Sequence, residues 1–244
     1  MNTKLPLGVR MLNLAGRSAA TFGWQIAPLH AQSFIDKAVE ETGLSDYGGS
    51  DFKEPLGRLI DSLENEAQLS LLGRMAARGD IMRCLSYRLK LVELCKQHPE
   101  IEQAPIKRPI MVIGPPRTGT TIFHDLLAMD PANRAPLTWE CAHPLPPPEA
   151  ATFLTDPRIA AQDAELAQVD KLIPAFKTMH PMGAQRAQEC TVITTYAFAS
   201  MMYNTQFNIP SYEDWVTEAD MSAALAFHHK FLQVLQWKAP AERW

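Results

Sequence analysis

The sequence predicts an α/β fold in which helices flank a parallel sheet, preceded by a helical N-terminal region. Three observations support this prediction. Residues 1–105 carry apolar side chains at helical spacing. A short apolar run at 110–113 is followed by a glycine turn and a helical stretch, which is how α/β nucleotide-binding units begin. The composition, 46% hydrophobic and 20% charged over 244 residues, is that of a globular protein with a substantial core. We therefore expect two parts, residues 1–105 and 106–244.

The N-terminal part shows two amphipathic stretches. Apolar residues recur with helical spacing from Leu59 to Met75, and again from Ile81 to Val92. Between them, Gly79-Asp80 predicts that one helix stops and another begins, with Asp80 as N-cap. These stripes are typical of helices packed in a core and carry no functional signal of their own.

The second part opens with a strand, a turn and a helix. Residues 110–113 (IMVI) lie between a proline and a glycine and predict a buried parallel strand. The helix should run from Thr120 to Met129, where Asp130-Pro131 ends it. Residues 134–139 predict a second short strand. Further helices are expected from Asp156-Pro157 toward Leu172 and from Gln188 to Met202, and a last one begins near Asp220.

Charge and motif content exclude several classes of function. The net charge of −4 and a pI near 6.0 give no overall positive field for nucleic acid, so any anion site must be local. The four cysteines form no C-x-x-C pair, and no H-E-x-x-H cluster predicts a metal site. The N-terminus lacks a signal-peptide core, and no apolar run approaches the ~20 residues that span a bilayer. A cytoplasmic protein without a membrane span is expected.

The strongest motif is Gly114-Pro-Pro-Arg-Thr-Gly-Thr-Thr121, which has the G-x-x-x-x-G spacing of a Walker A loop. Such a loop surrounds an anion with backbone N–H groups and a helix N-terminus. A nucleoside triphosphatase has lysine after the second glycine, whereas here that position is Thr120 and the cation, Arg117, lies inside the loop. A nucleotide kinase or triphosphatase with a degenerate loop is therefore the less favoured, rival interpretation.

The segment PPRTGTT resembles the 5′-phosphosulfate loop of sulfotransferases that use 3′-phosphoadenosine 5′-phosphosulfate (PAPS). The stretches LSDYGGSDFKEPLGRLIDSLENEAQLSLLGR, HDLLAMDPANRAPLTWECAHPLPPP and MHPMGAQRAQECTVITTYAFASMMYNTQFNIPSYEDW also resemble the bacterial members of this group, so the likeness covers most of the chain. It implies a P-loop-like fold, PAPS as co-substrate, no metal, and an acceptor that is a small or lipid-like hydroxyl or amine compound. The residues it assigns to the phosphosulfate group are Pro116, Arg117, Thr118, Gly119, Thr120 and Thr121, with Arg117 also catalytic through the bridging oxygen.

Sulfuryl transfer needs a base for the acceptor, and Glu140 is the first candidate. Tyrosine- and heparan-modifying sulfotransferases are similar in having a glutamate base at about this distance after the loop. A carboxyl group against the indole of Trp139 should also have a raised pKa. Glu140 could instead only pair with a buried arginine. Glu189 and His180 are alternative bases, but they could also line the acceptor pocket or form a structural salt bridge to Arg186. His124, His228 and His229 are expected to be packing or structural residues. An apolar acceptor wall could be formed by Tyr203, Phe207, Tyr212 and Trp215, although aromatic residues at this density are more often core.

The sequence departs from the family in one respect. Members continue with further strands and an R-D-P…S motif for the 3′-phosphate, and neither occurs before Trp244. The resemblance then implies an incomplete sheet with an exposed edge, a tendency to aggregate, and weak PAPS binding by a truncated gene product. A remnant that binds phosphate without catalysis is a third, non-enzymatic interpretation.

Overall fold

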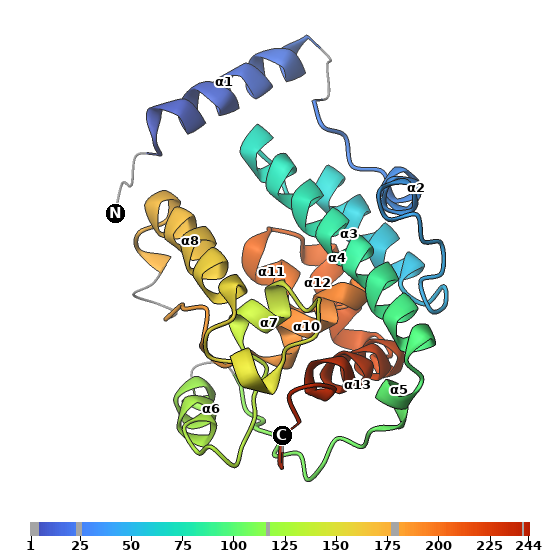
Figure 1. Cartoon of the computed structure of the whole chain (residues 1–244). Helices are drawn as coiled ribbons and strands as arrows, with labels where there is room; N and C mark the ends of the chain where they lie inside the picture. Colours follow the sequence, from blue (N-terminus) through green and yellow to red (C-terminus); the bar gives the residue numbers. More distant parts are fainter. Residues whose placement is uncertain (1–4, 23–25, 116–117, 177–180, 241) are drawn as a thin grey trace. The chain divides into compact units, whose positions relative to one another are not determined.

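The computed structural model of the chain describes residues 5–22, 26–115, 118–176, 181–240 and 242–244. These residues are mainly helical (Figure 1). The elements are α1 (Leu7–Thr21), α2 (Ala31–Thr42), α3 (Lys53–Asn65), α4 (Leu71–Gln97), α5 (Glu100–Gln103), α6 (Thr120–Ala128), α7 (Thr138–Ala142), η1 (Ala150–Thr152), α8 (Pro157–Leu172), α10 (Cys190–Thr194), η2 (Thr195–Ala197), α11 (Met202–Gln206), α12 (Pro210–Glu218) and α13 (Ser222–Gln236).

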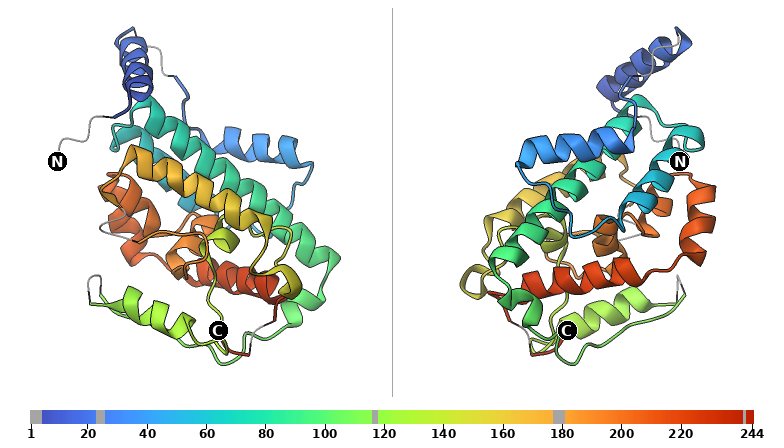
Figure 2. Two further views of the ribbon diagram at one scale, coloured as in Figure 1. Left: turned by 60° about the vertical axis from the view of Figure 1, so that its left-hand side comes forward. Right: turned by 90° about the vertical axis from the view of Figure 1, so that its right-hand side faces the viewer.

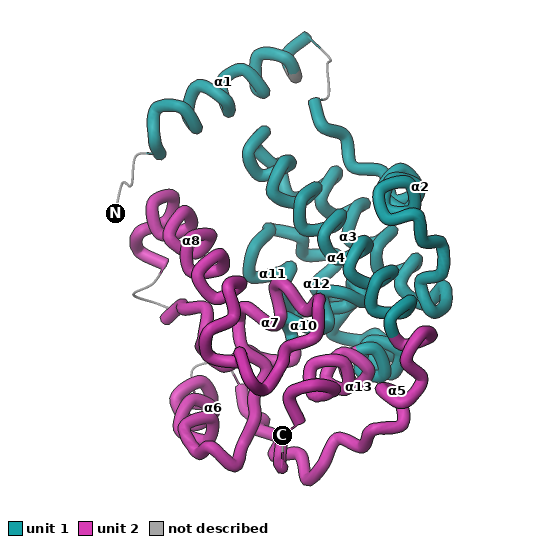
Figure 3. The backbone as a smooth tube through the Cα atoms, viewed as in Figure 1, with its two compact units in different colours: residues 1–94, 191–227 teal, residues 95–190, 228–244 magenta. Residues whose placement is uncertain are grey.

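The chain forms two compact units (Figure 3). Unit 1 consists of residues 1–94 and 191–227, and unit 2 of residues 95–190 and 228–244. Each unit is built from two stretches that are distant in the sequence. The predicted domain boundary near residue 105 stays a prediction, because a division into compact units does not test where one domain ends and the next begins.

Unit 1 contains residues 1–94 of the predicted helical N-terminal region, and residues 95–105 belong to unit 2. The interruption predicted at Gly79-Asp80 is wrong, because α4 runs through both residues. A glycine inside a helix costs about 1 kcal/mol relative to alanine. That cost is offset by the burial of the α4 side chains that follow it, including Ile81 and Leu85. The real break comes earlier, between α3 and α4. Asp80 pairs with Arg83 one turn along the same helix, and is not an N-cap.

A buried arginine lies in the centre of unit 1. The Arg88 guanidinium lies over the rings of Phe52 and Phe227, at 4.9 and 4.5 Å from their centroids. It donates to both carboxylate oxygens of Asp51, at 3.1 and 3.0 Å, and to the carbonyl oxygen of Tyr47 at 2.9 Å. Arg88 thus ties α4 to the segment that precedes α3.

Unit 2 lacks the predicted sheet in the part of the chain that the structure describes. Its only strand-like pairings there are isolated bridges, Asn133 with Arg243, Leu137 with Ala187, and Glu149 with Lys238. The residues predicted as a strand, 110–113, form no strand: the backbone N–H of Ile110 donates to the carbonyl oxygen of Trp244 at 2.6 Å, and Ile113 is 88% exposed. The prediction of a buried strand is wrong here because a strand is buried only when neighbouring strands and covering helices supply partners.

Predictions that rest on local signals fare better. Asp156 caps α8 by accepting the N–H of Arg158 at 2.9 Å, and Pro157 is its first residue. The helix after the loop is α6, as predicted. The second predicted strand, 134–139, is wrong, because α7 begins at Thr138. The helix predicted over 188–202 is shorter: α10 begins at Cys190 and is followed directly by η2, which ends at Ala197 because Phe198 has a left-handed backbone with φ of 57°.

Candidate active site

The glycine loop closes onto itself at the start of α6. Gly119 is the N-cap with φ of 93°, a left-handed conformation that favours glycine. A Cβ on Gly114 would lie 2.8 Å from Cγ2 of Thr120 and 3.0 Å from Oγ1 of Thr118, so the loop folds back on its first glycine. The Thr118 hydroxyl donates to the carbonyl oxygen of Pro115 at 2.7 Å. Gly119 is therefore favoured by its backbone conformation, and Gly114 by the threonine side chains that lie against it.

This turn places Gly114 next to the N-terminus of α6. The first turn of a helix leaves N–H groups without intrahelical acceptors, and its dipole favours an anion there. Thr120 and Thr121 are the first two residues of α6, so their N–H groups are among these. Pro116 and Arg117, which were predicted to bind the phosphosulfate group, lie outside the described residues, as does His180.

Helix α6 lies at the edge of its unit (Figures 1 and 2). None of its residues is buried, and Ile122, Phe123 and Leu126 are exposed apolar side chains. The segment before the loop also carries exposed apolar side chains, Ile110, Met111 and Ile113.

Glu140, the predicted base, lies on α7 and is 0% exposed. Its Oε1 accepts a hydrogen bond from Nη2 of Arg134 at 2.7 Å, and its Oε2 accepts the backbone N–H of Leu137 at 2.9 Å. Arg134 also donates to the carbonyl oxygens of Leu235 and Ala239, at 2.9 and 3.2 Å. A buried ion pair therefore joins α7 to the end of α13 and the segment after it.

The surroundings of this pair are aromatic. The Arg134 guanidinium lies over the rings of Phe153 and Trp244, at 5.0 and 4.7 Å from their centroids. Burial raises the pKa of Glu140 to about 7, although Arg134 and the Leu137 N–H oppose the rise. The Nη1 atom of Arg134 is buried and finds no acceptor among the described residues. The site thus holds a carboxyl group that titrates near neutrality beside a cation with one free donor.

Trp139, next to Glu140, is fully buried on α7. The Arg158 guanidinium lies 4.7 Å from the centroid of its ring and donates to the carbonyl oxygen of His143 at 2.9 Å. The backbone N–H of Trp139 donates to the carbonyl oxygen of Ala184 at 3.0 Å. These contacts fix the helix that carries Glu140 from two sides.

The segment 184–188 connects α6 with α7. The Arg186 side chain forms an ion pair with Asp125 of α6. Its carbonyl oxygen accepts both the backbone N–H and the hydroxyl of Thr138, at 2.9 and 3.1 Å. Gln188 donates to the Thr138 hydroxyl at 2.8 Å. One residue therefore contacts both the helix that follows the loop and the helix that carries Glu140.

The remaining predicted residues are placed less favourably. The salt bridge considered between Glu189 and Arg186 is wrong, because Arg186 pairs with Asp125. Tyr203 and Tyr212, considered as an acceptor wall, are buried in unit 1 with centroids 6.0 Å apart, and are core residues. Phe207, Trp215 and His124 are half-buried, and burial lowers the pKa of His228, which lies with His229 on α13.

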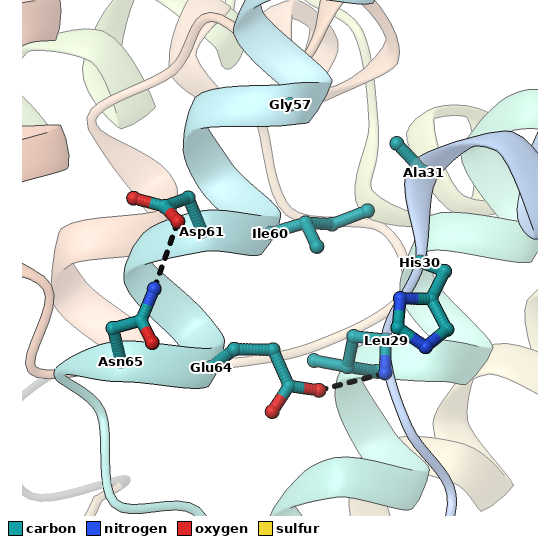
Figure 4. Close-up of a pocket in the computed structure, with 8 residues that line it drawn as sticks. All are labelled: Leu29, His30, Ala31, Gly57, Ile60, Asp61, Glu64 and Asn65. Atoms are coloured by element: carbon teal, nitrogen blue, oxygen red, sulfur yellow. Dashed lines mark hydrogen bonds between the residues drawn. The ribbon is translucent and has the colours of Figure 1, made fainter.

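A pocket of about 500 Å³ lies in unit 1 between the residues before α2 and helix α3 (Figure 4). Its acidic residues are already engaged. Glu64 accepts the backbone N–H of Leu29 at 2.7 Å and two hydrogen bonds from Arg74, at 2.7 and 2.6 Å. Asp61 accepts from Asn65 at 2.8 Å. None of the predicted site residues that the structure describes lines this pocket.

Sequence reasoning missed Arg134 and the Asp125–Arg186 pair. No motif marks Arg134, because its partners near residues 235–244 are about a hundred positions away. The Asp125–Arg186 pair likewise joins positions far apart in the chain. The sequence held a signal for only one of these pairs. Arg134 and Glu140 are close in sequence and opposite in charge, so Arg134 could have been named as the buried arginine with which Glu140 pairs.

Comparison with known proteins identifies the family. The model of the sulfotransferase family matches residues 109–241, which is more than half of the chain. The chain belongs to this family. It is similar to the crystal structure of the sulfotransferase STF1 from Mycobacterium tuberculosis, with 32% identity and a TM-score of 0.76 over 89% of this chain and 60% of that one. It is also similar to the structure of STF9 from Mycobacterium avium, with 32% identity and a TM-score of 0.77 over 87% of this chain and 55% of that one.

The chain thus spans 55–60% of the length of these two structures. No curated protein sequence gave a significant match. Among the described residues no helix is long and apolar enough to cross a membrane, and no three His, Cys, Asp or Glu side chains are grouped as metal ligands would be. The fold, the loop and the comparisons together therefore place the chain in a bacterial sulfotransferase family.

Proposed function

We propose that the protein transfers the sulfuryl group of PAPS to a hydroxyl or amine of a small or lipid-like acceptor. The observation that carries the proposal is the glycine turn at the start of α6, in which Gly114 packs against Thr118 and Thr120 and Gly119 caps the helix. Such a turn suits a doubly charged 5′-phosphosulfate group, because backbone donors can surround it without a metal ion.

Arg117 is the proposed catalytic cation of the loop. Charge builds up on the oxygen that bridges phosphorus and sulfur as the S–O bond breaks. A guanidinium aimed at that oxygen stabilises the transition state more than the ground state. The loop has no lysine after Gly119, the group with which a triphosphatase contacts the γ-phosphate, and this favours sulfuryl over phosphoryl transfer.

Glu140 is the proposed base that accepts the proton of the acceptor. The raised pKa of about 7 supports this role, because a base works best when its pKa lies near the operating pH. Its ion pair with Arg134 supports equally a structural role. The free Nη1 of Arg134 is a donor that an acceptor oxygen could meet when it approaches Glu140. The competing base Glu189 has no such support among the described contacts, and His180 lies outside the described residues.

Binding of 3′-phosphoadenosine 5′-phosphate without metal tests the loop. We expect calorimetry to show binding that Arg117→Ala weakens at least tenfold. Lys107→Ala, which removes one exposed positive charge shortly before the loop, is the matched control and should leave affinity within about twofold. Unchanged affinity of the Arg117 variant, or hydrolysis of ATP that depends on magnesium, would overturn the proposal and favour the rival triphosphatase.

The base is tested by transfer of radiolabelled sulfate from PAPS to a phenol, a primary amine and a long-chain alcohol as probes. Glu140→Gln keeps a hydrogen-bond acceptor for the Leu137 N–H but cannot take a proton. We expect it to lose ~100-fold or more in transfer while nucleotide binding persists. A variant that keeps full transfer would assign Glu140 to structure alone. A chain that binds the nucleotide but transfers to none of the probes would favour the non-catalytic interpretation.

A further inference from the structure

Helix α1 has two faces, and only one of them is packed against unit 1. On the packed face, Oδ1 of Asn13 accepts the backbone N–H of Leu72 at 3.1 Å. A Cβ on Gly16 would lie 2.7 Å from the Cβ of Leu71, so the helix touches α4 closely at this point. Figure 2 shows α1 beside the beginning of α4 and clear of the other helices of unit 1.

The opposite face carries a row of exposed apolar side chains. Leu7, Met11 and Leu14 are 70%, 63% and 64% exposed. At 3.6 residues per turn, they lie within about 60° of one another around the helix axis. Large apolar side chains that share one exposed face indicate a surface that binds a partner.

The charge on α1 indicates which partner. Arg10 and Arg17 flank the apolar row on one side of the helix, and both are exposed. The first acidic residue of the whole sequence is Asp36, so nothing within α1 neutralises them. A helix with an apolar face, a cationic border and no acidic residue is suited to the interface of an anionic bilayer. Its 15 residues span about 22 Å, which is enough to lie on a membrane and too short to cross one.

A second copy of the chain fits this face less well. Two α1 helices packed through their apolar rows would bring four arginines together without a carboxylate. Three side chains per copy also fall far short of the ~1,200 Å² that a stable protein interface buries. Binding to an anionic lipid surface brings no further arginines together and does not depend on an interface of that area.

We propose that α1 binds the surface of an anionic membrane, with Leu7, Met11 and Leu14 inserted at the boundary of the acyl chains and Arg10 and Arg17 at the headgroups. This inference is independent of the sulfuryl-transfer proposal, since it uses no residue of the loop or of α7. The protein would then have a second binding surface besides the sulfotransferase site, and this surface would bring it to membranes, where lipid molecules are found.

Sedimentation of the full chain with vesicles tests the inference. At low salt we expect binding to phosphatidylcholine vesicles that contain phosphatidylglycerol, and little binding to phosphatidylcholine alone. Leu14→Asp and, separately, Met11→Asp should weaken binding at least tenfold. Leu225→Asp is the matched control, because Leu225 is a leucine of unit 1 that is 53% exposed on α13. Circular dichroism should show the same helix content and melting for all variants, since each replaced side chain is exposed.

The cationic border has its own test. Replacing Arg10 and Arg17 by glutamine should lower the affinity for anionic vesicles and reduce its salt dependence, whereas replacing Lys37 and Lys53 should change neither by more than about twofold. Equal binding to vesicles with and without phosphatidylglycerol would overturn the inference. So would Leu14→Asp binding like the unmodified chain, or a dimer in size-exclusion chromatography that Leu14→Asp dissociates.

Discussion

Each of the two units encloses a buried arginine, and the two arginines meet carboxylates of different accessibility. Arg88 of unit 1 pairs with Asp51, whose side chain is 32% exposed. Arg134 of unit 2 pairs with Glu140, which is 0% exposed. Both guanidinium groups lie between two aromatic rings and donate to backbone carbonyl oxygens.

The difference decides what each pair can do. Asp51 keeps part of its hydration, so only Arg88 of this pair is desolvated, and burial lowers the pKa of its guanidinium. Glu140 has lost its hydration, and its negative charge depends on Arg134. A group whose charge is so finely balanced can exchange a proton near neutral pH. Similar packing therefore yields a structural pair in one unit and a titrating pair in the other.

Removing the cation of unit 2 should have the largest effect. Arg134→Met keeps an unbranched apolar stem between Phe153 and Trp244 but leaves Glu140 buried and unpaired. We expect the free energy of unfolding at pH 8 to fall by about 3–5 kcal/mol. At pH 5, where Glu140 is protonated with or without Arg134, the loss should be clearly smaller. Urea denaturation followed by tryptophan fluorescence at both pH values measures this. Equal losses would show that the carboxyl group is not ionised by its partner.

Glu140→Gln sharpens the comparison from the other side. The pKa of Glu140 is raised by burial from 4.5 to about 7, so the folded state holds this proton more tightly than the unfolded state. The contribution of Glu140 to the free energy of unfolding should therefore be largest below about pH 4.5. This contribution should fall as the pH rises to about 7. The total fall is roughly 3 kcal/mol.

The glutamine variant lacks this titration. The difference in free energy of unfolding between variant and unmodified chain should therefore change by most of that amount, about 2.5 kcal/mol, between pH 5 and pH 8, in favour of the variant at the higher pH. Urea denaturation at matched pH values cancels the contributions of all other groups. A difference that is constant over this range would contradict the raised pKa.

Arg88→Met in unit 1 should cost less, about 1–3 kcal/mol. It leaves the carbonyl oxygen of Tyr47 without its donor, but Asp51 can rehydrate because it reaches solvent. The loss should be similar at pH 5 and pH 8, in contrast to Arg134→Met. Urea denaturation of both variants side by side provides the measurement. A strongly pH-dependent loss for Arg88→Met would remove the distinction between the two pairs.

The comparison also shows what could be predicted from the sequence. Local signals worked where the backbone itself imposes them. Gly119 takes a left-handed conformation that favours glycine, and Asp156-Pro157 supplies both a cap and a preset φ for α8. The loop, α6 and α8 were predictable for this reason.

Properties that depend on distant segments were not predictable. The run 110–113 has the composition of a buried strand, yet burial requires partners that the described residues do not provide. Glu140 was found as a titratable candidate, but its location on α7 and its pairing with Arg134 depend on contacts with Leu235, Ala239 and Trp244. Such contacts leave no periodicity in the sequence. Conversely, α4 continues through Gly79 because packing outweighs the local preference.

The smallest expected effect concerns the link between α6 and α7. Asp125 and Arg186 are 33% and 35% exposed, so their ion pair is worth about 0.2–1 kcal/mol. Asp125→Arg and Arg186→Asp alone should each lower stability by about that amount, and the double exchange should restore part of it. Urea denaturation of the four proteins forms a double-mutant cycle. Additive losses would show that the two side chains do not interact in solution.

The same exchange tests whether this weak pair positions the loop. Because Arg186 also accepts two hydrogen bonds from Thr138 through its backbone, the pair can set α6 relative to the helix that carries Glu140. Each single variant should then lower the affinity for 3′-phosphoadenosine 5′-phosphate severalfold, and the double exchange should recover it, although the total charge is unchanged. The pair Lys37 and Glu41 of α2, exchanged in the same way, is the control and should leave nucleotide affinity unaltered. If the single variants lose stability but bind the nucleotide normally, the pair holds two helices together without positioning the loop.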